Sequence, residues 1–281
     1  MFRLNLKVQV KGKHSIRRLS RTVWFGIAFI IVGIVLIFLA MPTGDPQYPT
    51  NSNELKAVII DQLYTLQSND DFIQQVTEEL EDYGFKVEFY KGDEVTVGLY
   101  KRLPLENYQL IIFRAHSGAL SSTMMGDVVS TGATYLFTDE AYVNTRYRQE
   151  QLTDQVLRAR ITEDSPEVFA VGAKFVSRSM QGRFPNTVII MMGCSTMHST
   201  DLAEAFTNRG VSAYLGWNGP VNLDYVDEAT LFLLENLCHD MSIKQAVTET
   251  NKEVGPDPEY MAYLKYYPTE AGDKNIDELI N

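Results

Sequence analysis

Apolar residues in this chain alternate between short runs of strand length and longer stretches with helical spacing. The run KAVII at residues 56–60 is rich in β-branched residues and predicts a buried strand. Residues 69–83 begin with cap-type polar residues, carry apolar side chains at helical spacing and end before Gly84, which predicts a helix. By the same criteria, further strands are expected at 86–90 and 110–115, and a short helix at 95–103.

The second half of the chain repeats this alternation. Residues 188–192 (VIIMM) form the strongest strand pattern in the sequence. The alternation of strands and helices predicts an α/β fold, with a mostly parallel sheet covered by helices on both faces. The other expected elements are strands or hairpin insertions at 134–137 and at 167–178, with a turn at Gly172-Ala173, a strand at 211–215, and helices at 200–208, 223–239 and 242–252.

Residues 23–41 form an uninterrupted apolar run, VWFGIAFIIVGIVLIFLAM. Its 19 residues can cross a hydrocarbon core of about 30 Å as a helix. Seven basic and no acidic residues precede it, so the positive-inside rule predicts a cytoplasmic tail at 1–22 and an extracytoplasmic position for the chain after residue 41. A cleaved signal peptide normally has a shorter apolar run, and a buried core helix normally keeps a polar face. We therefore expect a single-pass anchor in the cell membrane, in contact with lipid.

Residues 42–53 (PTGDPQYPTNSN) have the composition of a linker, which leaves one domain at 54–281. Hydrophobic residues make up 45% of the chain, enough for a core without a disulfide framework. The net charge is -11, and the part after residue 41 carries 18 basic against 36 acidic residues. Because nucleic-acid binding begins with phosphate neutralisation, this acidity argues against a nucleic-acid partner.

Two polar positions directly follow strong strands. His116 follows LIIFRA, and Cys194 follows VIIMMG. Functional groups gather at the carboxyl ends of strands in open parallel sheets, so the two side chains are expected to lie on one edge. An imidazole can activate a thiol as a nucleophile. The small residues around both positions make the N–H groups of Gly118 and Cys194 candidate oxyanion donors.

The order strand–His–small–Gly, followed about 80 residues later by strand–small–Cys–Ser/Thr, resembles the caspase-like cysteine peptidases. This group includes caspases, legumains, clostripain, gingipains, separases and CHAT-domain proteins. The stretches GCST, DLAEAFTNRG and VSAYLGWNGPV are most similar to the gingipain and CHAT members. The resemblance covers most of residues 56–265 and implies a caspase-like α/β fold in which Cys194 is the nucleophile and His116 the base or acid. Two positions depart from the family pattern: Ser117, where much of the family has Gly, and Gly193, where many members have Ala.

The resemblance also suggests residues for the S1 pocket, which holds the side chain before the scissile bond. Asp61 ends the first strand, and Trp217 follows the strand VSAYLG. A carboxylate at Asp61 and an aromatic wall at Trp217 would favour Arg or Lys in that pocket. In the alternative, Asp61 caps the following segment, Trp217 is simply buried, and Asp139 or Glu140 contributes to the pocket.

The sequence thus predicts a membrane-anchored cysteine endopeptidase that acts on peptides or proteins with a His116–Cys194 dyad. We expect no cofactor, because no cluster of His, Cys, Asp and Glu has the spacing of metal ligands. Cys238 is expected in the core and His198 on the surface; a Cys194–Cys238 disulfide is the alternative. A catalytically silent caspase-like binding or sensor module is the second hypothesis, favoured by Ser117, and an unrelated ligand-binding α/β domain is the third.

Overall fold

A computed structural model of the chain describes residues 54–124 and 127–281. Its centre is a mixed sheet with the order β10-β9-β8-β3-β1-β2, in which β10 alone is antiparallel to its neighbour. The predicted α/β fold with a mostly parallel sheet is therefore confirmed. The strands are β1 (Leu55–Asp61), β2 (Phe85–Lys91), β3 (Leu110–Arg114), β8 (Thr187–Met191), β9 (Val211–Trp217) and β10 (Leu264–Tyr267).

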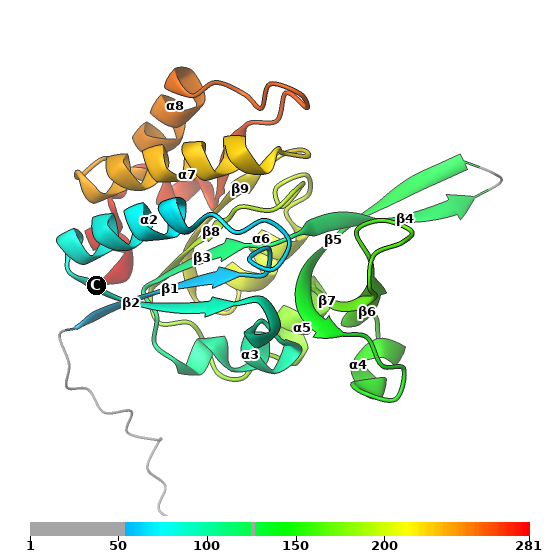
Figure 1. Ribbon diagram of the computed structural model, residues 1–281. Coiled ribbons are helices and arrows are strands. Elements are labelled where there is room, and N and C mark those ends of the chain that lie inside the picture. Colours follow the sequence, from blue (N-terminus) through cyan, green and yellow to red (C-terminus); the bar gives the residue numbers. More distant parts are fainter. Residues whose placement is uncertain (1–53, 125–126) are drawn as a thin grey trace, which may run out of the picture. The chain divides into compact units, whose positions relative to one another are not determined.

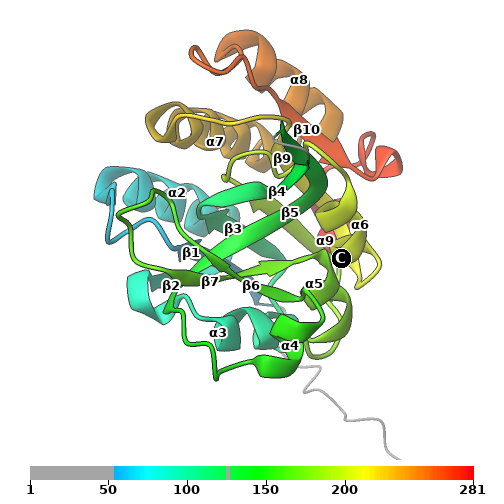
Figure 2. The same cartoon turned by 90° about the vertical axis from the view of Figure 1, so that its right-hand side faces the viewer.

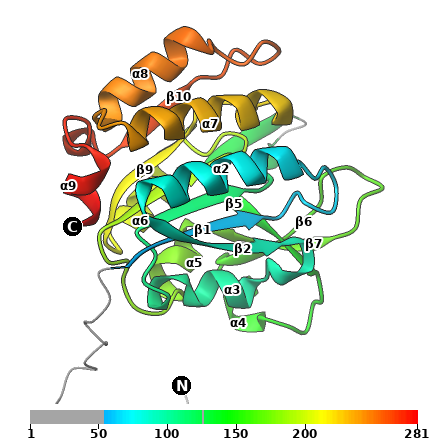
Figure 3. The ribbon, with the colours of Figure 1, turned by 60° about the vertical axis from the view of Figure 1, so that its left-hand side comes forward.

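Helices cover both faces of this sheet (Figures 1 and 3). Alternate strand residues point to opposite faces, so Leu110 and Ile112 pack in one core cluster while Ile111 and Phe113 pack in the other. The first cluster includes α2 (Asp70–Tyr83), α7 (Leu223–Cys238), α8 (Ile243–Glu253) and α9 (Ile276–Ile280). The second includes α3 (Val97–Arg102), α5 (Ala173–Arg178) and α6 (Asp201–Thr207).

A second, antiparallel sheet has the order β4-β5-β7-β6. It lies on the side toward which the parallel strands point (Figure 1), and its ribbons are in front of the central sheet in Figure 2. Its first strand starts three residues after β3 ends, so the chain passes directly from the central sheet into this second one. The elements are β4 (Ser117–Met124), β5 (Asp127–Ala141), α4 (Arg148–Leu152), β6 (Val156–Ala159) and β7 (Val168–Gly172).

Several expected elements have the predicted type with shifted ends, and one differs in kind. The helix expected at 95–103 is α3, flanked by the 3-10 turns Gly92–Glu94 and Leu103–Leu105; a third such turn spans Thr269–Ala271. Residues 167–178 were expected as strand or hairpin, but the segment is β7 followed by α5. Phe175 and Val176 are buried in α5, and both pack in the second core cluster.

The predicted tail 1–22, membrane-spanning residues 23–41 and linker 42–53 lie outside the described residues. Within residues 54–124 and 127–281, none of the helices combines the length and the apolar character that a membrane span requires. The described residues form one compact unit.

Candidate active site

His116 and Cys194 lie just beyond the ends of neighbouring parallel strands. In the β3–β8 register Phe113 pairs with Met191, and each of the two site residues follows three positions later. This equal offset brings both residues to the same edge of the sheet, where they line one cavity of about 230 Å³. The cavity is open enough for a water-sized group to reach both side chains, which are partly exposed.

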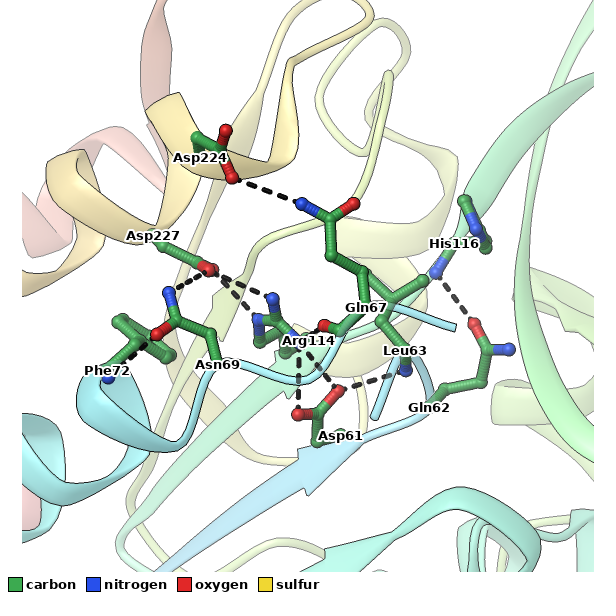
Figure 4. A network of polar contacts seen from close by, with 10 residues as sticks. All are labelled: Asp61, Gln62, Leu63, Gln67, Asn69, Phe72, Arg114, His116, Asp224 and Asp227. Carbon is green, nitrogen blue, oxygen red and sulfur yellow. Dashed lines mark hydrogen bonds and ion pairs between the residues drawn. The ribbon is translucent and has the colours of Figure 1, made fainter. Parts of the chain in front are cut away.

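The main chain at His116 is fixed on both sides. Its N–H donates to Gln62 Oε1 at 2.9 Å (Figure 4). Its carbonyl accepts from Phe137 N–H at 2.9 Å. The Phe137 ring lies 6.1 Å from the imidazole, centroid to centroid. Burial lowers the pKa of His116, because the charged imidazolium is less well solvated there. At pH 7 the ring is therefore neutral and able to accept a proton.

A second layer of polar residues supports His116. Gln62 is buried, and its own N–H donates to the Arg114 carbonyl at 2.9 Å. The Gln62 side chain also hydrogen-bonds the Asp139 carboxylate, which Thr65 contacts as well. Because its Oε1 accepts from His116, the amide group of Gln62 must be the donor toward Asp139. Asp139 and Gln62 thus hold the backbone at His116 rather than its ring.

Cys194 lies in a tight turn between β8 and α6. Its Sγ is 3.7 Å from the Val221 carbonyl oxygen, within range of a weak S–H···O hydrogen bond. The next residue, Ser195, has φ 57°, a left-handed conformation, and its N–H donates to the Gly219 carbonyl at 2.8 Å. These contacts tie the Cys194 turn to the segment after β9, which also forms part of the cavity wall.

Ser117 and Gly193 are packed against each other, and the side chain of one lies beside the Cα of the other. Ser117 Oγ donates to the Cys194 carbonyl at 2.7 Å. A Cβ built on Gly193 would lie 2.2 Å from that Oγ and 2.6 Å from the Ala115 carbonyl oxygen. The Ser117 side chain therefore occupies the space that an alanine at 193 would need. Ser117 and Gly193 are thus packed together and link the His116 and Cys194 segments.

The strand register indicates that the Gly118 N–H is used in a hydrogen bond within the second sheet. Ser117 faces Leu136 and Gly118 faces Tyr135, while Phe137 N–H bonds the His116 carbonyl. Hydrogen-bonded pairs alternate along an antiparallel ladder, so Gly118 is in a pair that bonds to Tyr135. The Ser117 N–H points the other way, away from β5. The oxyanion role expected for Gly118 thus fits Ser117 better, together with the N–H of Cys194.

Asp61 does not line the cavity, contrary to its expected role in substrate binding. It is fully buried, its two oxygens accept from Arg114 Nη1 at 3.0 and 3.1 Å, and it caps the N–H of Leu63 at 2.9 Å (Figure 4). The physical reason is the register: Asp61 of β1 pairs directly with Arg114 of β3. Burial raises the pKa of Asp61 to about 6, partly offset by the Arg114 guanidinium.

Arg114 is shared with a second carboxylate, which sequence reasoning did not identify. Its Nε and Nη2 donate to the two oxygens of Asp227 on α7 at 2.8 and 2.9 Å, and Nη1 also reaches the Gln67 carbonyl at 3.0 Å. Asn69 adds a donor to Asp227 at 2.9 Å. This buried Asp61–Arg114–Asp227 triad fixes the segment after β1, whose residues Leu63 and Gln67 line the cavity.

Trp217 is likewise absent from the cavity lining. Its side chain is buried in the same core cluster as Met192 and Val226, with its ring 5.3 Å from that of Tyr225 in an edge-on arrangement. It therefore supports the wall without forming it. Glu140, an alternative pocket residue, accepts from Val97 N–H, Arg146 and Tyr147 instead.

The structure also shows where Cys238 and His198 lie and whether the two cysteines are bonded. Both Cys194 and Cys238 are free thiols, so no disulfide joins them. Cys238 packs against the first core cluster, and burial raises the pKa of its thiol to about 12, with the nearby Glu79 adding to the shift. His198 is exposed, as expected. Scans of protein-family models and of curated proteins found no match to this chain, so the functional assignment rests on the geometry of the site.

Proposed function

We propose that the chain is a cysteine endopeptidase with Cys194 as nucleophile and His116 as proton carrier. The observation that carries this proposal is the placement of both side chains in one open cavity, beyond the paired ends of β3 and β8. The supported main chain of His116 and its neutral imidazole suit a general base. The proposal includes the caspase-like relationship that the sequence motifs imply.

In the proposed reaction, His116 removes the Cys194 proton and the thiolate attacks the scissile carbonyl carbon. The N–H groups of Cys194 and Ser117 hold the oxyanion of the tetrahedral intermediate. As the C–N bond breaks, the imidazolium returns the proton to the leaving amine. Water, deprotonated by His116, then hydrolyses the thioester and releases the carboxylic acid and the free thiol.

We also propose that this domain lies at a membrane surface. The apolar run at 23–41 and the basic residues before it support an anchor with residues 42–281 outside the cytoplasm. The substrate is then a peptide or protein on that side. Protease added to intact cells should digest the domain or its linker; protection until the cells are lysed would contradict the orientation.

The proposed chemistry is tested by comparing the two cysteine variants in peptide hydrolysis. Cys194→Ala should abolish activity, because no other nucleophile is assigned. Cys238→Ala, the matched control, should retain activity and lose some stability through a small core cavity. Circular dichroism establishes that both variants fold. Equal hydrolysis by wild type and Cys194→Ala would contradict the mechanism.

A catalytically silent binding module is the second candidate. The contact of Cys194 Sγ with the Val221 carbonyl favours it, since a thiol that donates there is turned toward the main chain. Such a module would bind peptides in the same cavity without cleaving them. Binding of a peptide by the wild type with no turnover, and no acylation of Cys194, would favour this candidate.

A further inference from the structure

The cavity beside the dyad has apolar walls supplied by three segments of the chain. The cavity volume of about 230 Å³ is below the roughly 300–1,000 Å³ of pockets that enclose whole small ligands, so it suits one side chain. The apolar wall residues that matter here are Leu63 and Leu66 after β1, Met192 after β8, and Val221, Leu223 and Val226 around the start of α7.

No charged residue is among the described residues that line the cavity. Asp61 and Asp227 are paired with Arg114. Asp224 and Glu259 do not line the cavity; they accept from the side-chain amides of the lining residues Gln67 and Asn222 at 3.1 and 2.9 Å, and Figure 4 shows the Asp224–Gln67 bond. A guanidinium or ammonium that entered the cavity would lose water without meeting a carboxylate in the lining, which is costly. An apolar side chain would gain from the same transfer.

We infer that this cavity is the specificity pocket of the proposed peptidase and that it takes an apolar side chain of about the size of leucine or methionine. The inference rests on the proposed function. Cys194 itself lines the cavity, so the side chain nearest the attacked carbonyl, that of the residue before the scissile bond, is the one that enters. This preference replaces the Arg or Lys preference expected from Asp61.

Leu66 is the wall residue at which specificity can be changed without disturbing the core. Its side chain is 59% exposed, whereas Val226 and Leu63 are buried. Leu66→Glu introduces a carboxylate at the cavity and should shift preference toward basic side chains. Leu152→Glu is the matched control, because Leu152 is 82% exposed on α4 and does not line the cavity.

The test measures how fast Cys194 of the full-length protein is alkylated by acyloxymethyl ketones of N-acetyl-Leu, N-acetyl-Arg, N-acetyl-Asp and N-acetyl-Gly. The thiolate displaces the carboxylate of the probe to form a thioether, which peptide mass analysis locates. The Leu probe should react at least about tenfold faster than the Arg probe, the scale of discrimination by an apolar pocket. The Leu-to-Arg rate ratio should fall about tenfold in Leu66→Glu and stay unchanged in Leu152→Glu.

The outcomes distinguish a failure of the pocket assignment from a failure of the proposed peptidase function. Fastest labelling of Cys194 by the Arg, Asp or Gly probe, or an unchanged ratio in Leu66→Glu, overturns the pocket assignment and leaves the cysteine chemistry standing. Labelling of Cys194 by none of the probes, under conditions in which iodoacetamide reacts with it, overturns the proposed peptidase function and the pocket with it.

Discussion

The side chain of Ser117 fills the space that a β-carbon at position 193 would need, and this pair connects the two halves of the site. Ser117 follows His116 and bonds the carbonyl of Cys194. This hydrogen bond joins the segment after His116 to the turn at Cys194. The sequence alone does not show this contact, because 77 positions separate Ser117 from Cys194, whose carbonyl it bonds.

Gly193→Ala should destabilise the protein by about 1–3 kcal/mol, the usual cost of overpacking a tight site. In a Ser117→Gly background the same substitution should cost less, since Oγ no longer lies 2.2 Å from the new Cβ; the cost that remains comes from the Ala115 carbonyl oxygen, 2.6 Å from that Cβ. Urea unfolding of the four members of this double-mutant cycle gives the coupling free energy. An equal cost of Gly193→Ala in both backgrounds would show that the two residues do not share the space.

The placement of His116 and Cys194 at one edge of the sheet could be predicted because each follows a strand so apolar that its end is clear in the sequence. Gln62 and Arg114 could not be predicted in the same way. Arg114 reads as an ordinary residue inside a strand, and its bidentate partner Asp227 is 113 positions away. The sequence suggests a substrate-binding role for Asp61 because it does not show the strand register that pairs Asp61 of β1 with Arg114 of β3.

Among the secondary-structure elements, the Asp61–Arg114–Asp227 triad holds β1, β3 and α7 together beneath the cavity. Two carboxylates share one guanidinium there, so the buried group carries an excess negative charge when all three are ionised. Its bonds to Leu63 and Gln67 extend to the segment that lines the cavity. The protonation state of the triad therefore bears on the stability of the fold and on the shape of the cavity wall.

Asp61 should make the stability of the protein depend on pH between about 4 and 6. Its pKa is about 6 in the folded state, above the unfolded value of 3.8, so the folded state holds the proton more tightly. The contribution of Asp61 to stability is then complete below pH 3.8 and is lost as pH rises through 6. Urea unfolding across this range should show the loss in wild type relative to Asp61→Asn.

The same substitution at exposed Asp71, in the first turn of α2, is the control for a general change of one charge. Relative to wild type, Asp71→Asn should not reproduce the pH-dependent difference. If the difference between wild type and Asp61→Asn were constant from pH 4 to 7, Asp61 would be ionised throughout and the triad would carry its excess charge at all these values.

Elements with a strong hydrophobic pattern have the secondary structure that the sequence predicts. Elements whose secondary structure depends on packing against other parts of the chain do not. Strands β3 and β8 are buried along their whole length, and their continuous apolar runs show this in the sequence. The segment after Gly172 has equally apolar residues, but packing against the second core cluster makes it the helix α5. The long hairpin of β4 and β5 was recognised at 134–137 alone, because its strands lack an alternating apolar pattern.

For the whole molecule, the decisive feature is the parallel arrangement of the central sheet. All of its strands except β10 point the same way, so segments far apart in the sequence end at one edge. The second sheet begins at that edge and fixes the segment after His116 through β4 and β5. Sequence patterns indicated the parallel sheet, but not the strand order that makes β3 and β8 neighbours.

His116 is proposed to activate Cys194, and the alkylation rate of Cys194 at pH 7 tests this activation. Full-length wild type and His116→Ala are treated with iodoacetamide, and Cys194 and Cys238 are followed separately by peptide mass analysis. His116→Ala should slow alkylation of Cys194 by about tenfold or more, because the thiol loses its base, and leave Cys238 unchanged. Equal rates at Cys194 in both proteins would contradict the dyad.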